Sequence, residues 1–234
     1  MSLPFNCRII FHVGIFVCLA SVKSISQTYC ENYFSECSYA KEFYRTHIVE
    51  FENSAKKTNE SARFLFSIVA PELTQYSWLK DKIESVALKV LYVQKGKGYA
   101  DFSIGYFQMK PSFIESLEAQ IKSYKDTLKR FQEILITEND PMQARITRIK
   151  RLETLDWQIK YLEVFVKIVE MKFKFRSFRS TEDKVAFYAS AYNVGFLKSE
   201  EVISKISEKQ LFPFFAKQKF KYKDVSLFFY RDKY

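Results

Sequence analysis

The sequence predicts an all-α protein, and three observations lead to this fold class. Apolar residues recur at three- and four-residue spacing along most of the chain. Glycine and proline, five of each in 234 residues, are too scarce for a protein built from short strands and turns. Side chains that cap helices precede several of the periodic runs. Because 47% of the residues are hydrophobic and no linker divides the chain, we expect one domain with a single core.

The N-terminus predicts a secretory signal. Arg8 is followed by the apolar run "IIFHVGIFVCLA", which is short for a membrane span and has the length of the hydrophobic region of a signal peptide. We expect residues 1–26 to be removed, which gives an exported protein of the periplasm or cell envelope with no stable transmembrane segment. An uncleaved anchor is the alternative.

Without that signal the chain keeps two cysteines, Cys30 and Cys37. An even number of cysteines in an exported protein, at this short spacing, predicts one local disulfide within the N-terminal segment 27–58. His47 would be the remaining histidine, so no cluster of histidine and cysteine ligands can form. We therefore expect neither a metal site nor a cofactor.

Segment 59–234 begins with the run "ARFLFSIVAPELTQY", whose apolar residues lie one turn apart on a helix. Pro71 is expected to end or kink this helix just before Glu72, because proline lacks the backbone N–H that a helix interior needs. The next run, "WLKDKIESVALKVLYVQKG", predicts an amphipathic helix closed by Gly96. A glycine-rich loop follows.

Two long helices are expected after this loop. Ser112 and Glu115 have the spacing of a capping box before the run "FIESLEAQIKSYKDTLKRFQEILI". Asp140, followed by a proline, opens a second helix that we expect to reach Lys174. Because only "TEND" separates them, these helices predict an antiparallel hairpin over residues 113–175. The hairpin is also a possible contact surface for an envelope protein partner.

The C-terminal third predicts two further capped helices. Ser180 or Thr181 caps "EDKVAFYASAYN", which Gly195 ends, and Ser199 caps "EEVISKISEKQ". The tail 217–234 mixes aromatic residues with lysines, and most of its aromatics are expected in the core.

The net charge of +10 favours an anionic partner: a membrane surface, an acidic cell-wall polymer or nucleic acid. The alternative is a basic surface that is simply solvated. Lysines interleaved with aromatic residues, as in the tail, also suit single-stranded nucleic acid. An exported protein rarely meets nucleic acid, so this partner ranks low. We expect no nucleic acid partner.

Three short segments carry residues that suggest chemistry: "APEL", "SIGYFQMKPS" and "AFYASAYNVG". In this order they resemble the soluble lytic transglycosylase and goose-type lysozyme superfamily, the lysozyme-like fold of the SLT domain. In that family a helix ends in a catalytic Glu, a Gly-x-x-Gln-x-x-Pro segment follows, and an Ala-Tyr-Asn-x-Gly segment closes the cleft. The matching residues are Gly105, Gln108, Pro111 and Ser112 in the second segment, and Ala191, Tyr192, Asn193 and Gly195 in the third.

This resemblance covers residues 60–196 and implies an exported enzyme that cleaves peptidoglycan. It implies a lytic transglycosylase that cuts the MurNAc–GlcNAc β-1,4 bond with one Glu as general acid and base. Leu73 follows Glu72 where the family usually has Ser, and the gaps on both sides of Gln108 are longer. A non-catalytic glycan-binding protein, or a helical interaction protein of the envelope, is the alternative.

Glu72 is the candidate catalytic acid. The apolar neighbours Ile68 and Val69 would disfavour its ionised form and raise its pKa, so that it stays protonated near neutral pH. Asp101 is the candidate second carboxylate, which would make hydrolysis possible; its alternative role is to cap a loop. Glu84 is a weaker substitute for it.

The remaining candidates would bind substrate. Gly105 lets the backbone approach a ligand, and Gln108 offers a donor and an acceptor to a sugar amide or hydroxyl. Tyr106 could stack on a pyranose ring. Tyr192 and Asn193, near a helix end, would reach an N-acetyl group. The alternative for Gln108 is a side chain bonded only to backbone.

Overall fold

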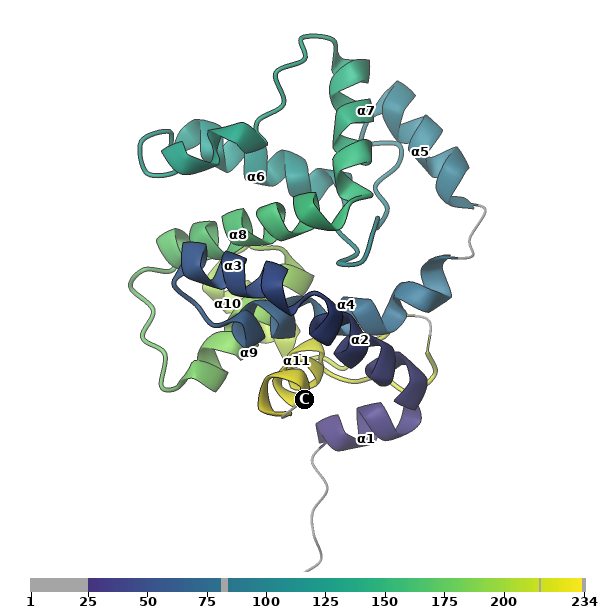
Figure 1. Ribbon diagram of the computed structural model, residues 1–234, viewed down its shortest axis with the longest axis vertical. Coiled ribbons are helices and arrows are strands. Elements are labelled where there is room, and N and C mark those ends of the chain that lie inside the picture. Colours follow the sequence, from purple (N-terminus) through teal and green to yellow (C-terminus); the bar gives the residue numbers. More distant parts are fainter. Residues whose placement is uncertain (1–24, 81–83, 215, 233–234) are drawn as a thin grey trace, which may run out of the picture.

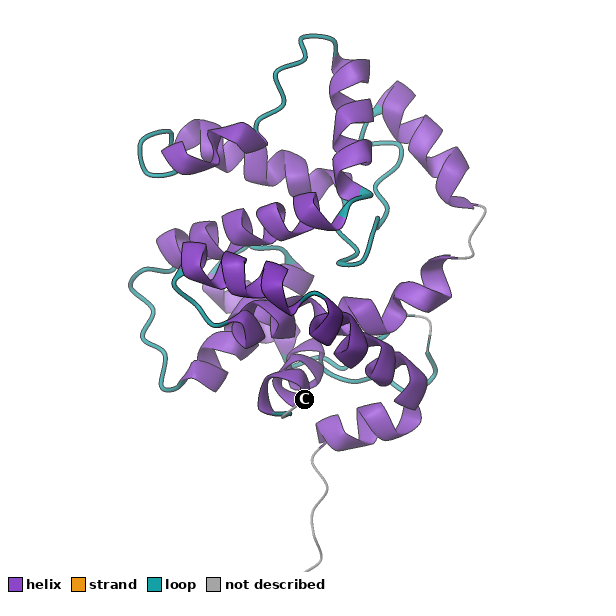
Figure 2. Cartoon of the chain, in the orientation of Figure 1, coloured by secondary structure: helices purple, strands orange, loops and turns teal. Residues whose placement is uncertain are grey.

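The computed structural model describes residues 25–80, 84–214 and 216–232, and residues 1–24, which hold most of the predicted signal peptide, lie outside them. Helices dominate the described residues, with two isolated β-bridges as their only strand pairing, and this confirms the all-α class (Figure 2). The elements are α1 (Ile25–Asn32), α2 (Phe34–Thr46), α3 (Ile48–Thr58), α4 (Ala62–Lys80), α5 (Glu84–Lys95), α6 (Pro111–Ser123), the 3-10 helix η1 (Lys129–Ile134), α7 (Pro141–Leu152), α8 (Leu155–Lys172), α9 (Thr181–Val194), α10 (Glu200–Ser207) and α11 (Tyr222–Arg231).

Helix α4 forms the centre of the core. It packs against α2, α3, α9 and α11, so that the N-terminal and C-terminal parts of the chain meet on its sides (Figure 1). Its inward side chains are fully buried: Phe64, Leu65, Ile68, Val69 and Leu73. Burying these five side chains along one helix stabilises the fold, because each apolar side chain removed from water contributes about 1.5–3 kcal/mol.

Helix α8 separates this lower group of helices from an upper one. It contacts α3 and α9 on one side and α6 and α7 on the other, and α5 packs on α7 (Figure 1). Ten of its residues are buried, among them Leu162, Phe165 and Val169, because it is covered from both sides. The loop between α5 and α6 leaves the upper group, reaches the lower group and then returns to α6.

The helix that contains Pro71 does not end there. Helix α4 continues to Lys80, so Glu72 lies inside a helix and not at its end. Pro71 leaves the carbonyl of Ser67 without an intrahelical N–H partner. The next carbonyl, that of Ile68, accepts a hydrogen bond from the Tyr222 hydroxyl of α11 at 3.0 Å. Burial of the flanking apolar residues outweighs the one lost hydrogen bond.

The expected hairpin of two long helices is also wrong. The first helix ends at Ser123 and is followed by turns and by η1; the second breaks at Glu153 and Thr154 into α7 and α8. In η1 the buried residues Phe131 and Ile134 are three residues apart, as a 3-10 helix requires. The segment therefore folds as the upper group of short helices and the central α8.

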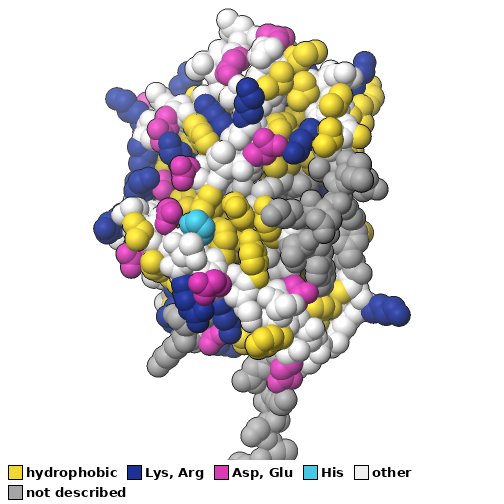
Figure 3. All heavy atoms as spheres, turned by 45° about the vertical axis from the view of Figure 1, so that its right-hand side comes forward, with side chains coloured by type: hydrophobic (Ala, Val, Ile, Leu, Met, Phe, Trp, Pro, Cys, Tyr) yellow, Lys and Arg dark blue, Asp and Glu magenta, His cyan; other side chains and the backbone are white. Residues whose placement is uncertain are grey.

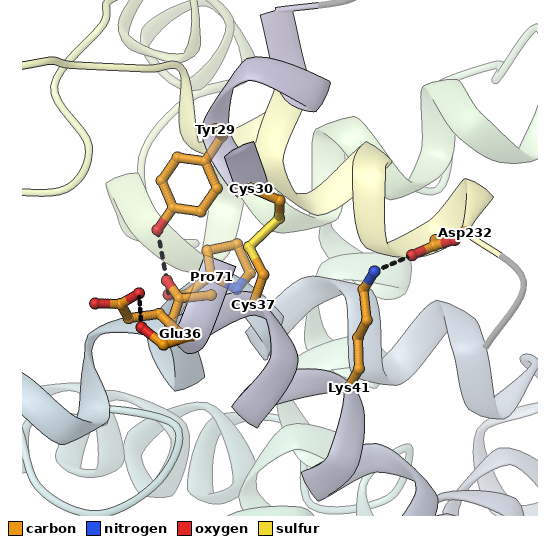
Figure 4. Close-up of a disulfide and its surroundings, with 9 residues drawn as sticks. Tyr29, Cys30, Glu36, Cys37, Lys41, Pro71 and Asp232 are labelled. Atoms are coloured by element: carbon orange, nitrogen blue, oxygen red, sulfur yellow. Dashed lines mark hydrogen bonds and ion pairs between the residues drawn. A yellow bond between two sulfur atoms is a disulfide. The ribbon is translucent and has the colours of Figure 1, made fainter. Parts of the chain in front are cut away.

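Cys30 and Cys37 form the disulfide that the sequence predicts, and it links α1 to α2 (Figure 4). The bridge lies beside Pro71 of α4 (Figure 4). Within the same region the Tyr29 hydroxyl is 2.6 Å from Oγ1 of Thr74, also on α4. The N-terminal segment therefore supports the stretch of α4 that carries Glu72.

Replacing both Cys30 and Cys37 with Ser should lower the free energy of unfolding by about 2–3 kcal/mol, the chain-entropy value for a loop this short. Urea denaturation of the oxidised protein and of the double variant measures the difference. An unchanged midpoint would mean that other contacts hold α1 in place.

The surface in Figure 3 carries lysines and arginines interspersed with acidic side chains, together with small groups of hydrophobic ones. Such mixing is typical of a solvated face. No helix within the described ranges has the length and hydropathy needed to cross a bilayer.

Candidate functional site

A cleft of about 1020 Å³ lies where α4, the α5–α6 loop and the C-terminal end of α9 meet. Residues 211–214, before α11, line its other side. Five of the candidate residues are on its wall, although they come from distant parts of the chain: Glu72, Asp101, Gln108, Tyr192 and Asn193. Gly105 and Tyr106 are not.

Glu72 reaches the cleft from the middle of α4 and is only partly exposed. Nε2 of Gln75, one turn further along α4, donates to its Oε2 at 3.4 Å. The Tyr222 hydroxyl, which donates to the Ile68 carbonyl, is also within hydrogen-bonding reach of the same carboxyl, and Lys110 adds a positive charge nearby. No cation forms an ion pair with Glu72 within the described ranges.

Burial raises the pKa of Glu72 from 4.5 to about 7. Desolvation is the main cause, since a carboxylate loses more hydration than a carboxylic acid does. The hydrogen bond with Tyr222 and the charge of Lys110 oppose the increase but are weaker. The carboxyl is thus held largely protonated at slightly acid pH and half protonated near neutrality.

This pKa predicts an unusual dependence of stability on pH. Between pH 4.5 and about 7 the folded protein holds a proton on Glu72 that the unfolded chain has released, so stability falls as pH rises through this range. The loss contributed by this carboxyl amounts to up to about 3 kcal/mol.

Thermal unfolding at pH values below and above this range measures the effect. The difference between wild type and Glu72→Gln isolates it from other titrating groups. The variant should become the more stable of the two as pH rises, and parallel curves would contradict a raised pKa.

Gln108 lies in a tight turn between the bridged residues Ile104 and Met109. Its backbone is left-handed, with φ of 49°, and its Nε2 donates to the Gly105 carbonyl at 2.6 Å. Its Oε1 has no hydrogen-bond partner within the described part of the chain. The Oε1 atom is itself buried, so the turn fixes the amide at the cleft wall with its one hydrogen bond going to backbone.

Gly105 approaches α8 and not the cleft. A Cβ at this position would be 1.8 Å from Nε2 of Gln158 and 2.5 Å from the Leu152 carbonyl, and φ is +73°. Gln158 is fully buried; its Oε1 accepts from the Phe107 N–H at 2.7 Å and its Nε2 donates to Leu152 at 2.7 Å. Gln158 therefore holds the turn that presents Gln108.

Tyr192 and Asn193 come from the last turn of α9, which Gly195 ends with φ of 109°. The Tyr192 hydroxyl donates to the Phe107 carbonyl at 2.7 Å, and its ring packs on Phe113. Tyr192 is thus a buried support for the turn that carries Gln108. Asn193 is exposed beside it and free to contact a ligand.

The Asp101 carboxylate caps the start of α6. It accepts hydrogen bonds from the Ser112 N–H at 3.0 Å and from the Ser112 hydroxyl at 2.7 Å. Asp101 lines the cleft, and each of its two oxygens accepts one hydrogen bond from Ser112, which fixes the carboxylate in place. Ser112 therefore pairs with Asp101 and not with Glu115 in a capping box. The side chain of Glu84 lies outside the described residues.

Tyr106 is part of an aromatic cluster on the side of α2. Its ring centroid lies 4.8 Å from that of Tyr76 and 5.0 Å from that of Phe43. The neighbouring Phe107 is fully buried. Tyr106 thus packs against Tyr76, one turn beyond Glu72 on α4, and is not among the residues that line the cleft.

Three residues of the site were not predicted from the sequence: Gln75, Lys110 and Tyr222. Lys110 and Gln75 are each within three residues of a candidate, so proximity could have identified them. Tyr222 could not be identified that way, because 150 residues separate it from Glu72 and only the packing of α11 on α4 brings them together. No group of three His, Cys, Asp or Glu residues suited to a metal ion occurs within residues 25–80, 84–214 and 216–232.

Comparisons with protein-family models, with curated proteins and with solved structures found no match to this chain.

Proposed function

We propose that this protein is an exported enzyme that cleaves the glycan strands of peptidoglycan, acting as a lytic transglycosylase with Glu72 as its single acid and base. The observation that carries the proposal is the cleft in which a carboxyl with a pKa of about 7 lies on the same wall as the Gln108 amide and Asn193. Such a carboxyl can both give and accept a proton near neutral pH.

The first step would be protonation of the bridging oxygen. A glycan strand in the cleft would place the β-1,4 oxygen between MurNAc and GlcNAc against the protonated Glu72. Transfer of the proton to that oxygen breaks the C1–O bond of MurNAc, and the GlcNAc end leaves as a neutral alcohol. The exposed amide of Asn193 suits an N-acetyl group of the strand, and Gln108 lines the cleft beside it.

The second step needs a base, and the Glu72 carboxylate formed in the first step can serve. It removes the proton from the 6-hydroxyl of the same MurNAc, whose oxygen then bonds to C1. The product is a 1,6-anhydro sugar, no water is consumed, and Glu72 is protonated again. Because the nucleophile belongs to the substrate, positioning replaces a second catalytic carboxylate.

The hydrogen bonds between Asp101 and Ser112 favour the transglycosylase reaction over hydrolysis. Inverting hydrolysis would need a second carboxylate to activate a water molecule. Asp101 is the acidic residue on the cleft wall besides Glu72, and hydrogen bonds from Ser112 to each of its oxygens fix it at the start of α6. We therefore assign Asp101 a structural role at the start of α6.

The proposed compartment is the periplasm or cell envelope. The Cys30–Cys37 disulfide supports it, since disulfides persist in oxidising compartments outside the cytoplasm.

Digestion of purified sacculi tests the proposal. Mass spectrometry of the soluble fraction should find muropeptides with 1,6-anhydro ends, each lighter by one water than the product of hydrolysis. Reducing ends in their place would show hydrolysis. Sacculi that retain the protein but release no muropeptides would contradict the enzyme and favour a non-catalytic glycan-binding protein.

A further inference from the structure

The loop between α8 and α9 has an unusual composition. Together with the helix ends that it joins, it spans residues 171–181, "MKFKFRSFRST", which contain four cationic side chains, three phenylalanines and no acidic residue. In Figure 1 this loop runs along the left edge of the molecule. Aromatic and cationic side chains in alternation are typical of segments that contact the headgroups of a membrane.

Two of the phenylalanines hold the loop against α9. Phe173 packs edge-on against Phe187 at 4.9 Å between ring centroids, and Phe178 lies 5.9 Å from the same ring. Arg176 lies over Phe187 and pairs with Glu200 of α10. The base of the loop is therefore fixed by packing and by charge.

The third phenylalanine points outward. Phe175 is 90% exposed, the largest exposed fraction among the large hydrophobic side chains in the described ranges. Lys174 lies over its ring and forms no ion pair with any residue that the structure describes. The Arg179 side chain is 92% exposed, and its Nε forms a long ion pair of 3.8 Å with Asp183. A fixed loop thus presents one phenylalanine between two cations.

The basic aromatic tail lacks this combination. Lys221 and Lys223 both pair with Glu208, and Lys219 donates to the Pro213 carbonyl at 2.6 Å. Phe220, Tyr222 and Phe229 of the tail are buried. Three of the tail's lysines are thus held by contacts within the protein and three of its aromatic rings are in the core, so the α8–α9 loop, with its exposed phenylalanine, is the better candidate for an anionic surface.

We propose that the α8–α9 loop docks on an anionic lipid bilayer, with Phe175 inserted among the headgroups and Lys174 and Arg179 at lipid phosphates. Insertion of one aromatic ring and attraction of a few cations are each weak, but together they give reversible attachment. A soluble polyanion would use the cations alone and leave Phe175 in water.

The loop is joined to one end of the cleft. Nζ of Lys172, at the end of α8, donates to the carbonyls of Phe196 and Lys198 at 3.0 and 2.7 Å. Both of these residues line the cleft. Docking through Phe175 would therefore hold that end of the cleft toward the membrane, whatever the cleft binds.

Vesicle sedimentation tests this docking. The protein should pellet with vesicles of phosphatidylglycerol and phosphatidylcholine in equal parts, and not with phosphatidylcholine alone. Phe175→Ser should weaken binding about tenfold, because it removes the inserted ring but no charge. Phe34→Ser, which removes a phenylalanine that is 75% exposed at the start of α2, is the matched control and should bind like wild type.

Phe175→Trp supplies a second readout. Its fluorescence, after subtraction of the wild-type signal, should shift to the blue on addition of the anionic vesicles. Failure to pellet with them, or binding that Phe175→Ser leaves unchanged, would overturn the proposal. Binding that depends on salt but not on residue 175 would identify plain adsorption of a basic surface and overturn it equally.

Discussion

Replacing Glu72 with Gln should lower the release of muropeptides from sacculi by about 100- to 10,000-fold, the usual contribution of a positioned general acid and base. Gln keeps the size and polarity of the side chain but cannot transfer a proton. The hydrogen bond from Gln75 can be retained, because an amide oxygen accepts as a carboxylate does. The measurement is the initial rate of release at fixed enzyme concentration.

Glu52→Gln is the matched control, since Glu52 is exposed on α3 and is not part of the cleft wall. Its rate should equal that of wild type. Circular dichroism should show that Glu72→Gln remains folded, and binding to sacculi should persist. A Glu72→Gln variant that releases muropeptides at the wild-type rate would remove Glu72 from the mechanism.

Replacing Arg148 with Met should lower the free energy of unfolding by about 3–5 kcal/mol, the usual cost of breaking a buried ion pair. Arg148 of α7 and Glu118 of α6 are both buried, at 7% and 6% exposure. Two hydrogen bonds of 3.0 and 2.8 Å join them, and Arg148 also donates to the Tyr92 hydroxyl of α5 at 2.8 Å. Without Arg148 the Glu118 carboxylate would stay buried with no countercharge.

Urea denaturation of Arg148→Met measures this cost. The double variant Arg148→Met/Glu118→Leu tests its cause, because replacing both members removes the unpaired charge and should restore most of the stability. A single variant within about 1 kcal/mol of wild type would place this pair among the weak surface ion pairs. Because this pair joins α6 and α7, the upper group of helices should unfold first in the single variant.

The helix ends were the most predictable part of the fold. Asp140 accepts from the N–H groups of Met142 and Gln143, and Ser180 and Ser199 cap α9 and α10 as expected. Gly96 has φ of 85° after α5. Each of these signals is local: a short polar side chain or a glycine acts within its own turn, so the sequence alone carries the information.

The break between α7 and α8 could not be predicted in this way. No Gly or Pro occurs there, and the Leu152 carbonyl at the end of α7 is satisfied by the Gln158 side chain. The same Gln158 binds the Phe107 N–H, more than 50 residues away in the sequence. A helix end that depends on such a distant contact leaves no periodic signal.

The cleft depends both on local sequence signals and on contacts between residues that are distant in the sequence. Short motifs picked out Glu72, Gln108 and Asn193 because the residue types suit sugar chemistry, and the folded chain brings them to one wall. Continuation of α4 through Pro71 depended on burial and on the Tyr222 hydroxyl of α11. Proline breaks helices through local geometry, whereas the tertiary packing that overrides it here comes from residues far away in the sequence.

The carboxyl of Glu72 can be titrated directly. Side-chain carboxyl carbons of the labelled protein, followed by NMR as pH is varied, should include one resonance that is absent from Glu72→Gln and that titrates near pH 7. A Glu72 resonance that titrates near 4.5, as an exposed glutamate does, would show an ionised carboxylate at neutral pH, with no proton to give to a glycosidic oxygen.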